Sequence, residues 1–410
     1  MMPSDNTKKR ARSAREKVAP YGSDIDLDKY EYSSTESHDL KSIDDLSEKD
    51  RALVRDVGFD PSQERVSGSF MQFDNEALLA DVLIQQRGLE VLPMNLALQK
   101  HDWLHDYLWN AVPVDTDKYT ARSELEQYDG YFIRAAAGAR IDMPVQSCLI
   151  MKKNRFVQNV HNIVIAEEGS ELHVITGCAT PSNVEQSLHL GVSEFYVKKK
   201  ARLTFTMVHR WSEKTDVRPR TATLVEDNGT FISSYAILSS PKSIQAFPKV
   251  KLIGTGAKAD LYSVVYGSKK SKYDIGGSLS LEATKSSGKV ISRSIATDEC
   301  EIIARGDLVG LSSETKGRLE CDGLLVSNSA VIRAVPMLAA RAEGSELSHE
   351  ATIGKVGAEQ LSYLMSRGLD EEEATSLIIR GFVKLKVPDL PPTLQKSIDD
   401  AIKMSLDGGM

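Results

Sequence analysis

The feature that most constrains the fold is a repeat of turns and short strands with a period near 28 residues. Turns at Gly169, Lys200, Gly229 and Gly256 are spaced by 31, 29 and 27 residues, and each is followed by a small residue and an alternating strand. Such a period without intervening helices is typical of a solenoid whose coils bury their inward positions and stack through ladder hydrogen bonds. We therefore predict a mainly β chain forming a right-handed parallel β-helix. A β-sandwich, whose strands also recur regularly, is the alternative.

A chain of 410 residues exceeds what one core ordinarily holds, so more than one structural unit is expected. Changes in residue pattern along the chain predict three parts. Residues 1–130 are expected to be a mainly helical or α/β region, with about the first 25 residues disordered. Residues 131–340 are the β-helix core, and residues 341–410 are a helical region.

Within these parts, residues 42–58 predict a short helix. Gly368, followed by Asp370 and Glu373 in a capping-box pattern, predicts a helical hairpin that caps the open end of the solenoid. One further helix is expected within residues 390–406.

Composition excludes several classes of protein. The net charge of −7 argues against broad binding of nucleic acid. No apolar run reaches 18 residues, so we expect no membrane span. The basic start lacks an apolar core, so we expect no secretory signal and a cytoplasmic protein. The four cysteines form no CxxC pair, and each is by default a small buried hydrophobe.

One candidate site joins Cys321 to His349 and Glu350. Cys321 and His349 are 28 residues apart, so they should lie on neighbouring coils, roughly 5 Å apart. Thiolate, imidazole and carboxylate ligands together suit iron or zinc. Because few ligands come from one chain, such a site would be labile or completed across a dimer. The alternative is a buried cysteine beside a His–Glu pair that caps a helix.

A second candidate site is Cys178 with His209, which follows 31 residues later, and His189 between them. A nearby imidazole can raise the thiolate fraction of a cysteine and make it a nucleophile. The alternative is a cysteine that merely occupies a tight turn. Cys178 and Cys321 are 143 residues apart, or five coils, which is about 24 Å along the solenoid. This separation suggests cargo accepted at one thiol and used at the other.

Two sequence blocks resemble the SufB/SufD family of the SUF iron–sulfur cluster assembly system. The first is "ITGCATP" followed by "SLHLGVSEF"; the second is "ECDGLLV" followed by "ELSHEATIGKVGAEQLSYLMSRGLDEEEATSLIIRGF". The resemblance covers roughly residues 150–385 and does not extend to the first 130.

The resemblance implies a scaffold that accepts persulfide sulfur on Cys178, with His189 or His209 assisting. It implies a transient iron–sulfur cluster, of the 4Fe–4S type, built at Cys321 with His349 and Glu350. It also implies a homodimer through the β-helix, a SufC-type ATPase bound by the C-terminal helices, a cysteine desulfurase or other sulfur donor, and apo iron–sulfur proteins as recipients. The retained residues place the chain on the SufB side of the family.

The chain departs from the SufB pattern at two positions. Ser348 stands where an acidic residue is usual, and His209 stands where a glutamine is usual. A ligand from the second protomer, or Cys300 as a spare thiol, would complete the site. No GxxxxGK[ST] loop is present, so we expect a scaffold and not an ATPase. A SufD-like adaptor without its own cluster is the main rival. A β-helix carbohydrate enzyme is the other, although no convincing carboxylate pair is found.

Overall fold

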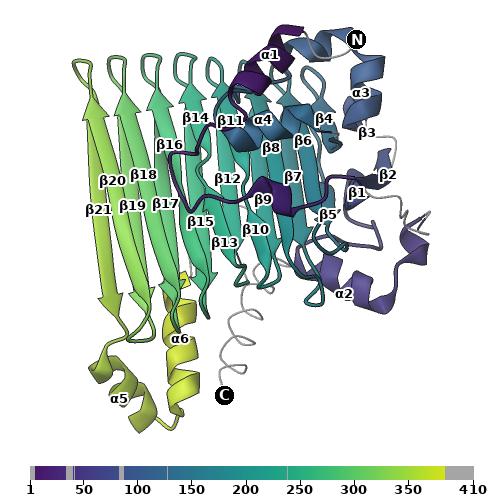
Figure 1. The fold of residues 1–410 in the computed structure, drawn as a ribbon. Helices are drawn as coiled ribbons and strands as arrows, with labels where there is room; N and C mark the ends of the chain where they lie inside the picture. Colours follow the sequence, from purple (N-terminus) through teal and green to yellow (C-terminus); the bar gives the residue numbers. More distant parts are fainter. Residues whose placement is uncertain are drawn as a thin grey trace.

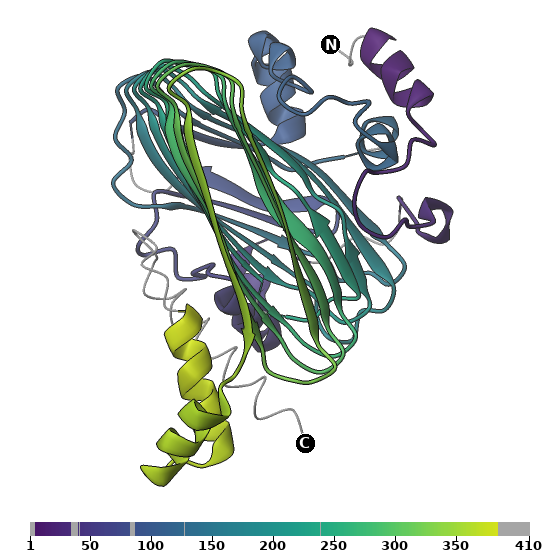
Figure 2. The same cartoon turned by 90° about the vertical axis from the view of Figure 1, so that its left-hand side faces the viewer.

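The computed structural model describes residues 5–33, 40, 42–82, 87–126, 128–237 and 239–383. Its strands wind into a β-solenoid of about eight turns, which confirms the predicted mainly β fold (Figure 1). Two large sheets face each other, and their inward side chains form one continuous apolar core (Figure 2). The predicted helix within residues 390–406 lies outside the described residues.

Sheet 1 contains ten strands, and all of its pairings are parallel except that of β1 with β2. In spatial order they are β2 (Glu76–Val82), β1 (Gly68–Phe73), β5 (Val145–Ile150), β7 (Glu171–Ala179), β9 (Arg202–Arg210), β12 (Thr230–Ile237), β15 (Lys258–Gly267), β17 (Ser287–Ala296), β19 (Lys316–Leu325) and β21 (Glu346–Lys355).

Sheet 2 contains eleven strands, and only β3 pairs antiparallel, with β4. Its path is β10 (Thr215–Val217), β13 (Ser243–Ala246), β16 (Lys272–Leu281), β14 (Lys249–Leu252), β11 (Arg220–Val225), β8 (Ser187–Val197), β6 (Val157–Ala166), β4 (Tyr131–Ala135) and β3 (Leu89–Pro93). Off this path, β18 (Glu301–Gly310) pairs with β16 and with β20 (Val331–Ala340).

The turns between coils use left-handed residues at the predicted period. Gly169, Lys200 and Gly256 have positive φ, as the repeat requires, whereas Asn228 takes this conformation in place of Gly229. Asparagine tolerates the left-handed region, which explains the shift by one residue. The series continues beyond the predicted turns in a list of further positive-φ residues: Lys285, Glu314 and Gly344.

The N-terminal helices cover the outer faces of both sheets. They are α1 (Asp5–Ser13), α2 (Glu48–Asp56), α3 (Met94–Lys100) and α4 (Lys118–Leu125), with short 3₁₀ turns at Leu27–Lys29, Ile43–Asp45 and Asp102–Asp106. Helix α2, within the predicted 42–58, begins at the cap Ser47 and is followed by Gly58. It packs on sheet 1, whereas α1, α3 and α4 lie over sheet 2 (Figure 1).

The chain start differs from the expected disorder. Helix α1 packs against α4, and Arg10 donates two hydrogen bonds to Asp115 at 2.7 and 3.1 Å. Strand β1, from the predicted N-terminal region, pairs in parallel with β5 and so belongs to the solenoid. At the other end, strand β21 extends the solenoid past residue 340, and helix begins only at Ala358.

The C-terminal helices α5 (Ala358–Ser366) and α6 (Glu371–Val383) form the predicted hairpin, with Gly368 at positive φ and reciprocal Asp370–Glu373 capping bonds. The predicted placement is wrong. The hairpin does not cap the open end of the solenoid but packs on the outer face of sheet 1, below the strands in Figure 1. Its buried Ile379 finds an apolar surface there that includes Ile295 and Leu324.

Candidate functional site

Cys178 faces the interior of the solenoid. It lies in β7, where its register neighbours are Leu149 on one side and His209 on the other. Three cysteines, Cys178, Cys300 and Cys321, line the inner core, whereas Cys148 faces the outer cluster beneath α2. All four are buried and unpaired, as the composition predicted.

His209 has a fixed hydrogen-bond partner on the next strand. Its Nδ1 lies 2.7 Å from the hydroxyl of Tyr235 in β12. Its Nε2 is buried and has no hydrogen-bond partner among the described residues, and the same holds for Nε1 of Trp211. If the Tyr235 hydroxyl donates to Nδ1, the Nε2 of His209 carries the ring proton.

His189 comes from the opposite sheet. Its Nδ1 lies 3.0 Å from Oε1 of Gln158, whose Nε2 donates to the backbone carbonyls of Asp74 and Ile150. The amide oxygen of Gln158 is therefore an acceptor, so Nδ1 of His189 carries the proton and Nε2 is an acceptor. A Cβ on Gly191 would lie 2.6 Å from that Nε2, so a glycine is needed beside the ring.

The two histidines form one cluster around Trp211. The ring centroids of His189 and His209 are 6.5 Å apart, and each lies about 5 Å from the indole of Trp211. Burial lowers the pKa of His189 to about 3, and burial and then the neighbouring His189 lower the pKa of His209. Both rings are neutral at physiological pH. The cluster therefore offers a proton acceptor in Nε2 of His189, and Nε2 of His209 is a donor when the Tyr235 hydroxyl donates to Nδ1.

The thiol of Cys178 is held protonated. Its complete burial raises its pKa well above the usual range for cysteine, because the charged thiolate is poorly solvated in the core. Sequence reasoning placed an activating imidazole beside this thiol, and register confirms the neighbour. Both imidazoles of the cluster are neutral, however, so neither is a cation that would stabilise a thiolate, and the proton acceptor is Nε2 of His189.

Cys321 and His349 lie on neighbouring coils and point to the same, inner face. Strands β19 and β21 pair in parallel, with Cys321 opposite Ala351 and His349 opposite Leu319, two residues along. The Nε2 of His349 is buried and has no hydrogen-bond partner among the described residues. Burial and then Glu320 raise the pKa of Cys321 to about 11.

Glu350 points the other way. It alternates with His349 in the middle of β21 and lies on the outer face, where Arg318 donates to it at 2.8 Å. The His–Glu pair therefore caps no helix, and its two side chains do not converge within one strand. The described residues contain no group of three or more His, Cys, Asp or Glu side chains arranged to hold a metal.

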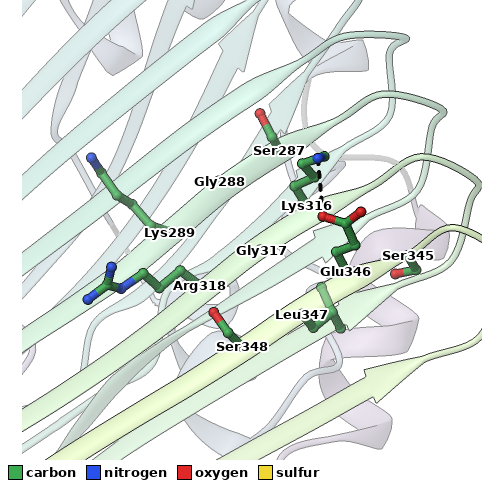
Figure 3. A pocket seen from close by; sticks show the side chains of 10 residues that line it. All are labelled: Ser287, Gly288, Lys289, Lys316, Gly317, Arg318, Ser345, Glu346, Leu347 and Ser348. Atoms are coloured by element: carbon green, nitrogen blue, oxygen red, sulfur yellow. Dashed lines mark ion pairs between the residues drawn. The ribbon is translucent and has the colours of Figure 1, made fainter.

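A shallow depression lies on the outer face beside this site, with a volume of about 710 Å³ (Figure 3). Its cations Lys289, Lys316 and Arg318 come from β17 and β19, and Lys316 pairs with Glu346 at 3.1 Å. Ser348, where an acidic residue was expected, also lines it. The depression is thus mainly basic and adjoins Glu350 through Arg318.

The two candidate sites are separated along one sheet. Strands β7 and β19 are five strands apart, which agrees with the predicted five coils and about 24 Å. Buried apolar side chains of the inner core, among them Leu261 of β15 and Val290 of β17, lie between them.

Sequence reasoning missed the residues that orient the histidines. His209 is hydrogen-bonded by Tyr235, and His189 by Gln158. The ring of Trp211 packs against His209. Tyr235 is 26 residues from His209, and Gln158 is 31 residues from His189. A search for polar residues one coil away from each candidate would have found both.

These features define a class of protein: a β-solenoid with two separate thiol–histidine pairs inside it. The chain belongs to the SufBD family of iron–sulfur cluster assembly. Residues 149–382 match the family model described as "SUF system FeS cluster assembly, SufBD core domain". Within the described residues, no helix is long and apolar enough to cross a membrane.

Similar chains named "Iron-sulfur cluster assembly SufBD family protein" occur in archaea and bacteria. The chain is 44% identical to one from Methanothermobacter thermautotrophicus (strain Delta H), over 98% of this chain and 99% of the relative. It is 43% identical to one from Archaeoglobus fulgidus, over 87% and 95%. It is 28% identical to one from Staphylococcus epidermidis, over 95% and 85%.

Proposed function

We propose that this protein is a SufB-type scaffold that accepts sulfur on Cys178 and assembles a transient 4Fe–4S cluster at Cys321, His349 and Glu350. The observation that carries the proposal is the placement of Cys321 and His349 on the inner face of the last two coils of sheet 1. The Nε2 of His349 is buried there and has no hydrogen-bond partner within the described ranges. A buried, unsatisfied ring nitrogen is costly and is suited to a ligand.

Sulfur transfer to Cys178 uses the two histidines in different roles. The thiol proton moves to the acceptor Nε2 of His189, and the Cys178 sulfur attacks the terminal sulfur of a persulfide on a desulfurase or other donor. The new S–S bond forms as the donor's S–S bond breaks, and the departing thiolate takes up the proton. When the Tyr235 hydroxyl donates to Nδ1 of His209, the Nε2–H of His209 donates to the negative sulfur during transfer.

At the second site the thiolate anchors iron, while the imidazole and carboxylate are weaker ligands that keep the cluster transferable to apo iron–sulfur proteins. Cys321 and His349 fit this role from the inner face, but Glu350 must swing from the outer face or act with a second protomer. Among the described strands, β21 pairs with β19 alone, so it has more freedom to adjust than an interior strand.

A homodimer through the solenoid end would bring two such sites together. At the N-terminal end of the solenoid, the antiparallel strands β2 and β3 interrupt the parallel stacking. At the other end the parallel pattern runs unbroken to β20 and β21, where Val335, Met337 and Ile353 are exposed. Apolar side chains on an open parallel edge favour association with a second copy.

The helical hairpin is the surface proposed for a SufC-type ATPase. It exposes Tyr363, Met365 and Leu377 while its other side packs on sheet 1. The chain itself lacks a phosphate-binding loop motif. The protein would therefore act as a non-enzymatic scaffold, and ATP hydrolysis by its partner would move the hairpin.

The second candidate is a SufD-like adaptor that docks the ATPase and carries no cluster. It is favoured by the outward direction of Glu350, which leaves two converging ligands among the residues that the structure describes in one protomer. A Cys321→Ala substitution separates the two candidates, because an adaptor keeps its support of cluster output and a scaffold loses it.

Anaerobic reconstitution with ferrous iron and sulfide tests the proposal. Visible absorption and Mössbauer spectra are compared for wild type, Cys321→Ser, Glu350→Ala and Cys178→Ser, with Cys148→Ser as the matched control on the outer face. If the protein is a scaffold, only Cys321→Ser and Glu350→Ala should lose the cluster, since free sulfide bypasses Cys178. Retention of a normal cluster in Cys321→Ser would refute it.

A further inference from the structure

A row of ion pairs crosses the outer face of sheet 1 and ends at Glu350. Register places Glu320 of β19 directly beside Glu350 of β21. One nitrogen of Arg318, Nη2, donates to both carboxylates, at 2.9 Å to Glu320 and 2.8 Å to Glu350. Two adjacent carboxylates repel each other, so the shared guanidinium holds both in place.

The row continues to the C-terminal hairpin. The Nη2 of Arg293 in β17 donates to the other oxygen of Glu320 at 2.7 Å, and Arg293 also pairs with Asp322. The ring of Phe382 in α6 covers the Arg293 guanidinium, 5.5 Å from the ring centroid. Helix α6 is thus connected to Glu350 through Arg293, Glu320 and Arg318.

We propose that Arg318 is a positioning residue that withholds Glu350 from metal until α6 moves. Arg318 bonds both Glu320 and Glu350. The strength of its bond to Glu350 therefore depends on whether the Glu320 carboxylate is also bonded by Arg293. When α6 moves and Arg293 leaves Glu320, Glu320 draws Arg318 to itself and releases Glu350 to an arriving iron ion. This inference rests on the proposed function in one respect, that Glu350 is an iron ligand.

The ion pair between Arg318 and Glu350 is weak enough to open reversibly, and we call this pair the latch. The side chains of Arg318 and Glu350 are 49% and 66% exposed, whereas Glu320 and Arg293 are mostly buried at 14% and 23%. Exposed ion pairs contribute little and are easily broken, while partly buried ones are stronger. The pair that must open is therefore the weaker one, and the pair that senses α6 is the stronger one.

Anaerobic titration of the full-length protein with Co²⁺, followed by thiolate-to-cobalt absorption, measures the latch directly. Arg318→Met keeps the apolar stem and removes the pair with Glu350, and it should tighten Co²⁺ binding about two- to fivefold. Lys316→Met is the matched control, because it removes the same charge from the same strand but pairs with Glu346. Equal tightening in both variants would overturn the proposal.

A double-mutant cycle tests the connection to α6. Arg293→Met and Phe382→Leu should each tighten Co²⁺ binding in the same direction as Arg318→Met. Both effects should vanish in the Arg318→Met background, because Arg318, which holds Glu350, is then absent and Glu350 is already released. If Arg293→Met and Phe382→Leu tighten Co²⁺ binding equally with and without Arg318, their effects come from the change in local electrostatics alone. That result would refute the connection to α6.

The Glu350→Gln variant separates this inference from the proposed function. If Co²⁺ binding requires Cys321 but is unchanged in Glu350→Gln, both the assigned role of Glu350 and the latch fail. If Glu350→Gln weakens binding while Arg318→Met matches Lys316→Met, the ligand assignment stands and only the latch fails. Weakened binding in Glu350→Gln together with the Arg318-dependent cycle supports both.

Discussion

At the scale of single residues, hydrogen-bond partners distinguish two similar side chains. The amide oxygen of Gln158 places the ring proton of His189 on Nδ1, whereas the direction of the Tyr235 hydroxyl decides where His209 carries its proton. Both rings are neutral and buried, and His189 presents a bare Nε2. Sequence spacing identified both histidines as candidates but could not choose between them, because the choice depends on partners in neighbouring coils.

The buried histidines predict a loss of stability in acid. The pKa of His189 falls from about 6.5 in the unfolded chain to about 3 in the fold, so its stabilising contribution is present above pH 6.5 and disappears as the pH falls toward 3. We expect His189→Gln, which keeps a partner for Gln158, to reduce the slope of the free energy of unfolding over this range. The reduction should reach about 1.4 kcal/mol per pH unit.

Urea unfolding at a series of pH values, followed by two independent spectroscopic probes, measures this slope. Identical slopes in the variant and the wild type would show that His189 is not neutral in the folded protein.

At the scale of elements, local sequence patterns predicted the secondary structure of a segment better than its position in the fold. Turn residues with positive φ and the Asp370–Glu373 capping box were readable from neighbouring residues. Strand β1 was not, because its partner β5 is more than 70 residues away. The hairpin was misplaced because the open end and the outer face of sheet 1 both offer apolar surface, and only side-chain packing decides between them.

The docking of the hairpin depends on Ile379, which is fully buried against sheet 1. Ile379→Ala should weaken docking by about 2–5 kcal/mol through lost burial and a cavity. Hydrogen exchange should then accelerate across α5 and α6 while the strands of sheet 1 stay protected. The control Leu377→Ala, at a half-exposed position in the same helix, should change exchange little. Equal effects of the two variants would contradict this packing.

At the scale of the whole molecule, the period of the repeat was enough to predict a solenoid and the separation of its two thiols. It could not predict that Glu350 turns outward, because the phase of β21 is set by its register with β19. Nor could it reveal that the two ends differ, since β2 and β3 leave the repeat and pair antiparallel.

The difference between the ends predicts how the protein associates. Met337 is about half exposed at the open end, so Met337→Lys should place a charge in the proposed dimer interface and yield monomers. Leu96→Lys, at a similarly exposed position in α3 near the other end, should leave the dimer intact. Sedimentation velocity distinguishes the two states. A wild-type monomer, or a dimer that survives Met337→Lys, would rule out this interface.

The central claim is that sulfur accepted on Cys178 is used at Cys321, and following labelled sulfur through the intact complex tests it most directly. A desulfurase charged with radiolabelled cysteine is mixed with the protein. Ferrous iron is added afterwards, together with dithionite as the electron donor that reduces persulfide sulfur to sulfide. The account predicts label first on the Cys178 peptide, then in acid-labile sulfide of a cluster, with the second step lost in Cys321→Ser. Labelled clusters formed at the normal rate in Cys178→Ser would contradict it.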